Sequence, residues 1–530
     1  MAKYRNYIVL SLLIIFALYC AMQLGRTWDV FFHYQMGKDR LDYLFSLGSN
    51  KVNDTISVRE FYTGAYATIS AFFVQFFPRK YILESLYIIN LFFSTLTVVG
   101  IYKISKELFN KNIAQIAFLF CFLNPIFFGH MAMNSTDTII AFSNIWFFYT
   151  TLRYFKYQKD NNKKNKYVLS LGILMGLGLG VRYSFMVTLL PIFLFLFLEI
   201  FYFKTMIRKD FSKKIFVFDS LKVIIIAYLF MVFFWPQTHS NILLEPFRIA
   251  VKGLSFGFGV PFILYNGDIF LTNELPKTYI LVNLFYKMPE FIILSFMLFI
   301  LLFFKINSFF KGRIKGFNFK ILSILLIIFF PNFLFLISPW GFYDGIRLFL
   351  YLIPFICIIS AILFFYIYKM VNINFYKLTF LILIFLKIFY LYNFFTVTPY
   401  HYVYLNLFAG KYFENSEKFE NDYWGVSTRK LISNIQDNRA FYGKKIRIAT
   451  CGLPKEAQNF YLKKVKDLKY KIVDKDEKFD FIIMNNRVIW DLKSDDYNPK
   501  NKQTCFEKYK GEDLIKIEKR GLVLSKITRI

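Results

Sequence analysis

Cysteine and histidine are scarce in this chain, which has only five cysteines and four histidines among 530 residues. No CxxC motif, HExxH motif or Cys/His cluster appears, so the sequence gives no support to a zinc site. Cys20, Cys121 and Cys357 lie in apolar stretches, where cysteine packs as a small hydrophobic residue. Cys451 and Cys505 lie in a more polar region near the end of the chain, where an oxidising compartment would permit a disulfide.

Acidic residues are also few, with 35 Asp and Glu against 65 Lys and Arg, which gives a formal net charge of +30. The chain has no internal repeat, low-complexity linker or heptad pattern, and this excludes solenoids and coiled coils. In a soluble protein such a charge would indicate a nucleic-acid partner. The distribution of the basic residues described below explains the charge without one, and we predict no nucleic-acid partner.

Long hydrophobic stretches dominate what is present, since 56% of the residues are hydrophobic and 22% are aromatic. Windows of about 20 nearly uncharged residues match the length needed to cross a bilayer as helices. The sequence therefore predicts an α-helical polytopic membrane protein with about eleven transmembrane helices, the first of them retained rather than cleaved as a signal peptide. The predicted helices are 6–25, 84–103, 113–130, 137–154, 167–182, 184–203, 216–236, 288–305, 321–338, 346–368 and 378–395. The apolar stretch 61–77 is either interfacial or a twelfth span.

The basic residues collect in alternate connections. With the N-terminus inside, the inner segments 1–5, 103–112, 153–166, 204–214, 305–320 and 369–377 hold 23 Lys and Arg and three acids. This bias predicts a cytoplasmic N-terminus and, with an odd number of spans, a C-terminus on the outer face. The abundance of Phe, Ile, Lys and Asn indicates an AT-rich genome, and we predict a bacterial inner (plasma) membrane.

The last part of the chain changes character at about Thr396. "KKIRIATCG" and "KFDFIIMNN" read as buried strands, and "PKEAQNFYLKKVKDL" reads as an amphipathic helix. "EDLIKIEKRGLVLSKIT" predicts a hairpin turned at Arg520–Gly521. We therefore predict two domains, a transmembrane catalytic domain at 1–395 and a small extracytoplasmic α/β domain at 396–530.

Asp29 and Asp137 are the candidate catalytic residues. Asp29 stands where the first helix emerges, and a carboxylate there is costly unless it faces a cavity or a partner. It is either an interfacial cap, a partner of Arg26, or a general base that takes a proton from an acceptor. Asp137 follows Asn134–Ser135–Thr136 at the start of another helix, where capping is the ordinary role. Both acids lie on the predicted outer face, so they could also share a divalent cation.

Three cations lie at the same level: Lys38, Arg182 and Arg347. An arginine at a helix end is usually a snorkelling anchor, but anchors on the outer face oppose the charge bias of the loops. A phosphate head group would explain them, because arginine binds phosphate bidentately. Alternatively, Asp344 is the structural partner of Arg347, three residues away.

Two further stretches need an explanation. "GLGLG" at 176–180 lies within a span and indicates close helix packing rather than a nucleotide loop. "NGDIFLTNELPKTYILVNLFYKMPE" at 266–290 reads as a partly ordered outer segment that either covers a site or connects two helices.

The order and sidedness of these motifs resemble the GT-C glycosyltransferases, especially protein O-mannosyltransferases and lipid A aminoarabinose transferases. The resemblance covers about residues 1–440. Four stretches carry it: "WDVFFHYQMG", "NPIFFGHMAMNSTDTIIAF", "GLGVRYS" and "YDGIRLFLYLIP". A fifth stretch, "TPYHYVYLNLFAGKYFENSEKFENDYWGVSTRKLI", is similar to a segment of uncharacterised bacterial members.

The resemblance implies a polyprenyl-phosphate-linked sugar donor, an external active site and inversion at the anomeric carbon. It maps the catalytic acids onto Asp29 and Asp137 and the phosphate contacts onto Arg182 and Arg347. Further substrate contacts are expected from His33, Lys38, Tyr343 and Asp344. The family often has an acidic pair at the first site, whereas Val30 follows Asp29 here, so the sequence leaves metal dependence open.

Two other functions fit an outer-face membrane protein. A transporter or flippase of lipid-linked sugars would show repeat symmetry and polar residues near the middle of the bilayer. A glycan polymerase or ligase would rely on large outer loops and arginine clusters, without an acid directly after the first helix. The acceptor in the first hypothesis could be a protein, lipid A or a surface glycan, and membrane lipids surround the site.

Overall fold

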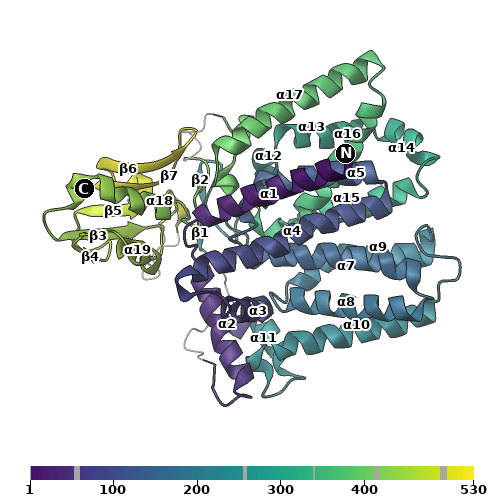
Figure 1. Cartoon of the computed structure of the whole chain (residues 1–530), viewed down its shortest axis with the longest axis horizontal. Helices are drawn as coiled ribbons and strands as arrows, with labels where there is room; N and C mark the ends of the chain where they lie inside the picture. The colour runs from purple at the N-terminus through teal and green to yellow at the C-terminus, as the bar shows by residue number, and fades with distance from the viewer. Residues whose placement is uncertain (1, 53–59, 255–259, 338–340, 411–416, 490–497) are drawn as a thin grey trace.

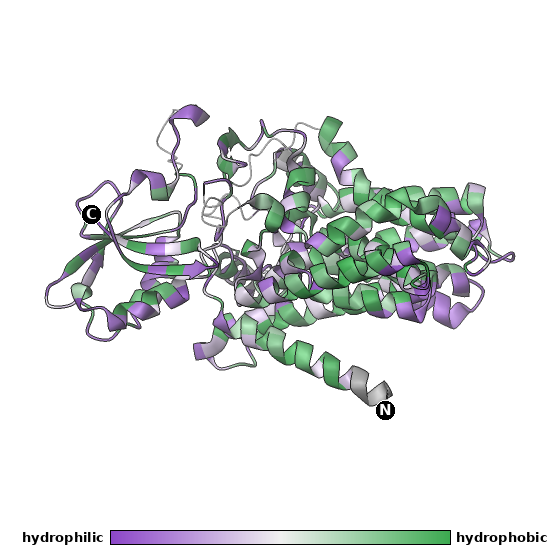
Figure 2. Cartoon of the chain, turned by 90° about the horizontal axis from the view of Figure 1, so that it is seen from above, coloured by the Kyte–Doolittle hydropathy of each residue, from purple (hydrophilic) through white to green (hydrophobic). Residues whose placement is uncertain are grey.

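The computed structural model describes residues 2–52, 60–254, 260–337, 341–410, 417–489 and 498–530. Its helices run roughly side by side in one large bundle, and a small domain with a β-sheet caps one end of the bundle (Figure 1). Hydrophobic residues cover the length of the helices, and hydrophilic ones gather at the loops and on the small domain (Figure 2).

All eleven predicted hydrophobic segments are helical. The helices that form them are α1 (Ala2–Gln23), α4 (Ile82–Leu108), α5 (Lys111–Phe122), α6 (Pro125–His130), α7 (Asp137–Tyr157), α8 (Asn161–Leu179), α9 (Phe185–Leu198), α10 (Lys213–Phe233), α13 (Glu290–Leu301), α14 (Phe303–Lys311), α15 (Phe317–Ile337), α16 (Leu352–Lys369) and α17 (Asn374–Thr396). Residue 338, the last of one predicted helix, lies outside the described residues.

Six of the described helices are long and apolar enough to cross a membrane, or seven if the bent pair α13–α14 is one span. The chain is therefore an integral membrane protein. Two predicted helices are interrupted. Asn124 ends one by accepting hydrogen bonds from the backbone of Ile126 and Phe127, which starts α6 anew. The other bends by 75° between α13 and α14.

Helix α2 (Val30–Phe45) was not predicted, because the sequence reading treated this stretch as a connector. Its buried positions Val30, His33, Met36, Gly37, Arg40 and Leu41 recur at helical spacing. Two of them are polar or charged, which hides the apolar periodicity. Helix α2 packs on α3 (Ala65–Val74), where a side chain at Gly37 would meet the backbone of Ala67 at 2.1 Å. Helix α3 is the α-helical part of 61–77 and is too short to cross a membrane.

The GLGLG stretch has the packing role expected of it. A Cβ at Gly176 would lie 2.8 Å from Cβ of Phe230 on α10, and one at Gly180 would lie 2.5 Å from Ala65. These glycines therefore let α8 approach both α10 and α3 closely. Between α10 and α13, the outer segment forms α11 (Glu245–Leu254), the hairpin β1 (Phe262–Tyr265) and β2 (Asp268–Leu271), and α12 (Tyr279–Lys287).

The C-terminal part carries a five-stranded mixed sheet in the order β4-β3-β5-β7-β6. Its elements are α18 (Thr428–Ser433), β3 (Ile446–Cys451), α19 (Lys455–Leu462), β4 (Tyr470–Ile472), β5 (Phe481–Met484), α20 (Cys505–Lys508), β6 (Glu512–Lys519) and β7 (Leu522–Arg529). Both predicted strands, the helix and the hairpin are confirmed. Arg520 and Gly521 turn the hairpin with φ of 56° and 82°.

This sheet domain is joined firmly to the bundle. One hydrophobic core cluster runs from the transmembrane helices through Tyr402 and Trp424 to Ile448 of the sheet. At the end of α1, the Gly25 amide donates to the Val426 carbonyl at 2.9 Å, and a side chain at Gly25 would meet that oxygen at 2.5 Å. The end of α1 that precedes Asp29 is therefore fixed by the C-terminal domain.

Candidate active site

Asp29 stands at the first position before α2, where its backbone carbonyl accepts a 2.9 Å hydrogen bond from the His33 amide. Its side chain accepts no capping hydrogen bond, and its ion-pair partner is Arg347, not Arg26. Oδ2 of Asp29 lies 3.7 Å from Nη1 of Arg347, and 48% of the Asp29 side chain is exposed. Arg26 instead stacks on Phe31 at 3.9 Å. The Asp29 carboxylate is therefore accessible and faces a buried cation.

Arg347 lies in a 3-10 turn (Arg347–Phe349) that leads into α16. Its guanidinium group is buried between the rings of Tyr343 and Trp424, each with its centroid 4.9 Å away. Nη2 pairs with Asp344 at 3.1 Å, which confirms the alternative that Asp344 is a structural partner. Nε and Nη1 are buried without a hydrogen-bond partner among the described residues. Buried guanidinium donors are costly to leave unbonded, so this arginine is prepared for an anion.

The Asp344 carboxylate bridges two arginines. Its Oδ2 pairs with Arg347, and its Oδ1 accepts a 2.9 Å hydrogen bond from Nη2 of Arg487 in the C-terminal domain. Only 2% of the Asp344 side chain is exposed. Both carboxylate oxygens of Asp344 are therefore engaged by arginines, and Asp344 holds the Arg347 side chain in place.

Asp137 forms a second buried ion pair. Nη1 of Arg182 lies 3.1 Å from its Oδ1, and Nδ2 of Asn134 donates to its Oδ2 at 3.0 Å. The Asp137 side chain is only 2% exposed, whereas that of Arg182 is 20% exposed. Arg182 lies in the turn between α8 and α9, as expected for a cation at the outer end of that helix.

His33 and Tyr62 lie between the two ion pairs. The His33 ring contacts the rings of Phe32 and Tyr62, each with centroids 5.4 Å apart. Burial lowers the pKa of His33 to about 4, with opposing contributions from acids and arginines that include Asp29 and Arg182. The predicted acids and arginines therefore all lie near the His33 imidazole, which is neutral at neutral pH.

A small cavity of about 30 Å³ adjoins this cluster. Polar side chains are interleaved with apolar ones in its lining, which is formed by Val30, His33, Tyr34, Met36, Tyr62, Gly64, Tyr66, Ala67, Ser70, Leu86, Tyr87, Asn90, Ala132, Met133, Ser135, Thr136 and Val181. The Tyr66 hydroxyl is buried without a hydrogen-bond partner among the residues described. Asn90 fixes the opposite wall by donating to the carbonyls of Met131 and Asn134.

Lys38 is exposed on α2 and does not line this cavity. Three residues of the cluster were missed by sequence reasoning: Tyr62, Trp424 and Arg487. Arg487 is separated from its partner Asp344 by 143 positions, so local spacing carries no signal for the pair. Trp424 lies in the "NDYWG" stretch that was noted for its resemblance, but nothing in that stretch indicates a contact with Arg347.

In the described part of the chain, no group of three or more His, Cys, Asp or Glu side chains is arranged to hold a metal ion. Asp29 and Asp137 each pair with a different arginine instead. The donor set therefore does not fit the divalent cation considered from the sequence. The disulfide is present: Cys451 and Cys505 are joined, and Cys20, Cys121 and Cys357 are free and buried.

Behind the cluster, the C-terminal domain adds a buried acid near the same arginines. Glu420 accepts a hydrogen bond from the Val488 amide at 2.9 Å. Burial raises the pKa of Glu420 to about 7, against the lowering effect of Arg487. It lines a small cavity with Asp344 and Lys287, and burial lowers the pKa of Lys287 to about 8.

Comparison with known proteins agrees with the resemblance seen in the sequence. Residues 65–235 match the family described as dolichyl-phosphate-mannose-protein mannosyltransferase. The structure is similar to that of ArnT from Cupriavidus metallidurans in the apo state, with a TM-score of 0.52, 9% identity and coverage of 100% of this chain and 98% of that chain. The undecaprenyl phosphate complex of the same protein gives a TM-score of 0.51 at 9% identity, with the same coverage.

An oligosaccharyltransferase from Archaeoglobus fulgidus has a TM-score of 0.48 at 12% identity, covering 92% of this chain and 70% of that chain. A search of curated protein sequences gave no significant match. The fold is thus similar to that of ArnT, and the family match is confined to residues 65–235 of this chain.

Proposed function

We propose that this protein is a glycosyltransferase that moves a sugar from a polyprenyl-phosphate-linked donor to an acceptor on the periplasmic face of a bacterial inner membrane, with Asp29 as the base. In this proposal eleven helices span the membrane, the N-terminus is cytoplasmic and the C-terminal domain is periplasmic. The contrast among the three acids of the site carries the assignment. Asp137 and Asp344 are buried in ion pairs, whereas the Asp29 side chain is about half exposed and, among the described residues, is paired with Arg347 at 3.7 Å without a hydrogen bond.

The reaction needs two groups, a base and a contact for the leaving phosphate, and we assign these roles to Asp29 and Arg347. Asp29 takes the proton of an acceptor hydroxyl or amine, whose lone pair then forms the new bond to the anomeric carbon. The bond from that carbon to the phosphate oxygen breaks in the same step, which inverts the anomeric configuration. The lipid phosphate leaves with the electron pair, and its charge is stabilised by Arg347 without a general acid.

Binding of the donor phosphate is supported by the state of Arg347. Two of its guanidinium donors are buried and unbonded in the described structure, and aromatic rings on both sides fix their direction. We assign Arg182 as a second phosphate contact that is held in place by Asp137. Tyr343 shapes the Arg347 side of the site, and His33 lines the small cavity beside it, so we assign both to substrate contacts.

Transfer assays on the purified full-length protein test this function. The protein is reconstituted in liposomes with a panel of radiolabelled polyprenyl-phosphate sugars and with protein, lipid A and glycan acceptors. We expect label to move to one acceptor class and the wild-type rate to exceed that of R347Q by at least about 10-fold, the usual effect of losing a charged hydrogen bond. Transfer from nucleotide sugars alone, or equal rates for both proteins, would contradict the proposal.

A further inference from the structure

We propose that Arg487 of the C-terminal domain is a positioning residue of the transfer site, which keeps the positive charge of Arg347 available to the donor phosphate. The inference rests on the proposed function, because it concerns the phosphate contact assigned there. In the described part of the chain, the Arg487 side chain bonds to Asp344 and to the Tyr423 carbonyl, and no ion pair joins it to Asp29. It acts through Asp344, whose carboxylate it shares with Arg347.

Arg487 is held by bonds from several directions. It follows β5, and its backbone amide donates to Oδ1 of Asn485 at 3.2 Å. Nη1 donates to the carbonyl of Tyr423, and Nη2 donates to Oδ1 of Asp344. The side chain is 6% exposed. The direction of the Arg487 side chain is therefore fixed largely by contacts within the C-terminal domain.

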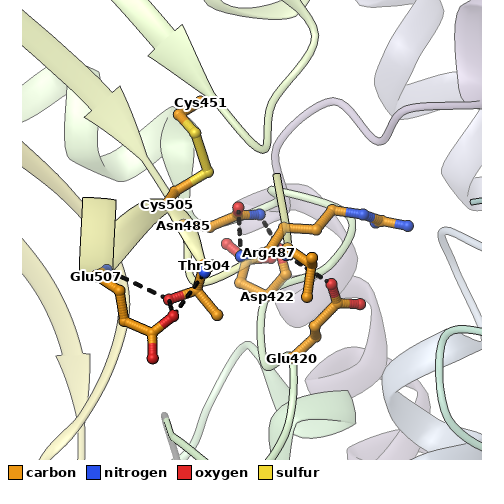
Figure 3. Close-up of a disulfide and its surroundings, with 9 residues drawn as sticks. Glu420, Asp422, Cys451, Asn485, Arg487, Thr504, Cys505 and Glu507 are labelled. Carbon is orange, nitrogen blue, oxygen red and sulfur yellow. Dashed lines mark hydrogen bonds between the residues drawn. A yellow bond between two sulfur atoms is a disulfide. The ribbon is translucent and has the colours of Figure 1, made fainter. Parts of the chain in front are cut away.

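The disulfide lies directly behind this arginine. The Cys505 amide donates to the Arg487 carbonyl at 2.9 Å, and Cys451 pairs with Met484 in the neighbouring strand register. Figure 3 shows the Arg487 side chain leading away from the Cys451–Cys505 bond. Gly452 packs against the same residue, where a Cβ would lie 3.0 Å from Cβ of Arg487. The cross-link therefore joins the end of β3 to the start of α20 next to Arg487.

The segment around Arg487 is also bonded to the stretch that carries Trp424. Nδ2 of Asn485 donates to the Asp422 carbonyl at 2.8 Å, and the Asn421 amide donates to Asn486 at 3.0 Å. Because Trp424 stacks on Arg347, the C-terminal domain reaches this arginine twice, once by a ring and once through Asp344.

Charge balance explains why a second arginine is needed. Asp344 alone would neutralise Arg347, and Asp29 would then leave the site negative and repel a phosphate. Arg487 compensates the Asp344 charge, so that Arg347 stays a net cation opposite Asp29. In a buried site such charges are weakly screened, so the effect on phosphate affinity is large. A residue with only a structural role would not give this dependence on the charge of Asp344.

Binding of undecaprenyl phosphate to the detergent-solubilised full-length protein tests the inference. We compare the wild type with R347Q, R487Q, the double variant D344N/R487Q, and R447Q as the control. Arg447 is an exposed arginine on β3 that pairs with Glu477 at 3.2 Å. Thermal unfolding of each variant is followed in parallel, and R487K is prepared in case R487Q does not fold.

We expect R487Q to bind at least 10-fold more weakly than the wild type and R447Q to bind as the wild type does. D344N/R487Q restores the charge of the site and should regain at least threefold of the lost affinity. R487K keeps the charge and should bind more tightly than R347Q. Wild-type affinity in R487Q, no recovery in the double variant, or R487K as weak as R347Q would overturn the inference. If the wild type itself does not bind undecaprenyl phosphate, the proposed function fails, and this inference fails with it.

Discussion

Nη1 of Arg347 lies 3.7 Å from Oδ2 of Asp29, a separation that makes an ion pair without a hydrogen bond. The acid is about half exposed, and the arginine is 3% exposed. A phosphate bound by Arg347 would therefore lie close to the Asp29 carboxylate. An acceptor could still reach the Asp29 carboxylate from solvent. The pair therefore places the proposed base and the proposed phosphate contact 3.7 Å apart.

Loss of Arg347 should weaken binding of the donor phosphate. We expect R347Q to bind undecaprenyl phosphate at least about 10-fold more weakly, the effect of losing a charged hydrogen bond. R313Q is the matched control, because Arg313 is exposed and only stacks on Phe309. Titration of both variants in detergent measures the difference, and equal affinities would remove Arg347 from the phosphate site.

Loss of Asp137 should reduce stability as well as activity. In D137N the buried partner of Arg182 becomes neutral, and we expect a loss of about 2 kcal/mol, below the usual range for broken buried pairs because Arg182 is partly exposed. The exposed Arg208–Asp210 pair offers the control D210N, with an expected effect under about 1 kcal/mol. Unfolding in detergent followed by tryptophan fluorescence compares the two variants. A D137N protein as stable as D210N would contradict the role given to this pair.

The disulfide should stabilise the C-terminal domain. It closes a separation of 54 residues, and removing it in C451S/C505S is expected to cost about 2–4 kcal/mol. Differential scanning calorimetry of wild-type protein with and without reductant gives the same comparison without a mutation. The double variant should not respond to reductant, and a wild-type protein equally insensitive would show that the bond contributes no stability.

Glu420 should make stability depend on pH. Burial raises its folded pKa from an ordinary 4.5 to about 7, so the folded protein binds this proton more tightly than the unfolded chain does. The corresponding stability is fully present below about pH 4.5 and is lost as the pH rises through about 7. Its charged neighbours are Arg487, Asp344 and Lys287.

In E420Q the amide oxygen can still accept from the Val488 amide, but no proton is bound. We therefore expect the melting temperature of E420Q to vary less between about pH 4 and pH 8 than that of the wild type, because these pH values bracket the range from 4.5 to about 7. Parallel slopes for the two proteins would show that Glu420 titrates as it does in the unfolded chain.

The helical part of the fold was largely predictable from the sequence because the length of a hydrophobic run is a strong signal for a helix that can span a membrane. The strands and hairpin of the C-terminal domain were found for a similar reason, since alternating and continuous apolar runs are bounded by turn residues such as Gly521. Helix α2 escaped because His33 and Arg40 occupy its buried face. The buried face of α2 could be recognised only from its contact with α3 in the structure.

The candidate site was predictable only in part. Asp29, Asp137, Arg182 and Arg347 were singled out because charge at a membrane boundary needs a reason, and the structure brings their charges together around His33. The sequence did not distinguish the three acids, because exposure and ion pairing depend on tertiary contacts. Arg487 could not be found at all, since its partner Asp344 lies in a different domain.

The central claim is that Asp29 removes the proton of the acceptor, and one comparison tests it most directly. Undecaprenyl phosphate binding and sugar transfer are measured on the same preparations of wild type and D29N, with the donor identified by the transfer panel. We expect D29N to bind undecaprenyl phosphate as tightly as the wild type or more tightly, because Arg347 loses a competing charge. We expect its transfer rate to be lower by a factor of about 10²–10⁴. Transfer by D29N at the wild-type rate would contradict it.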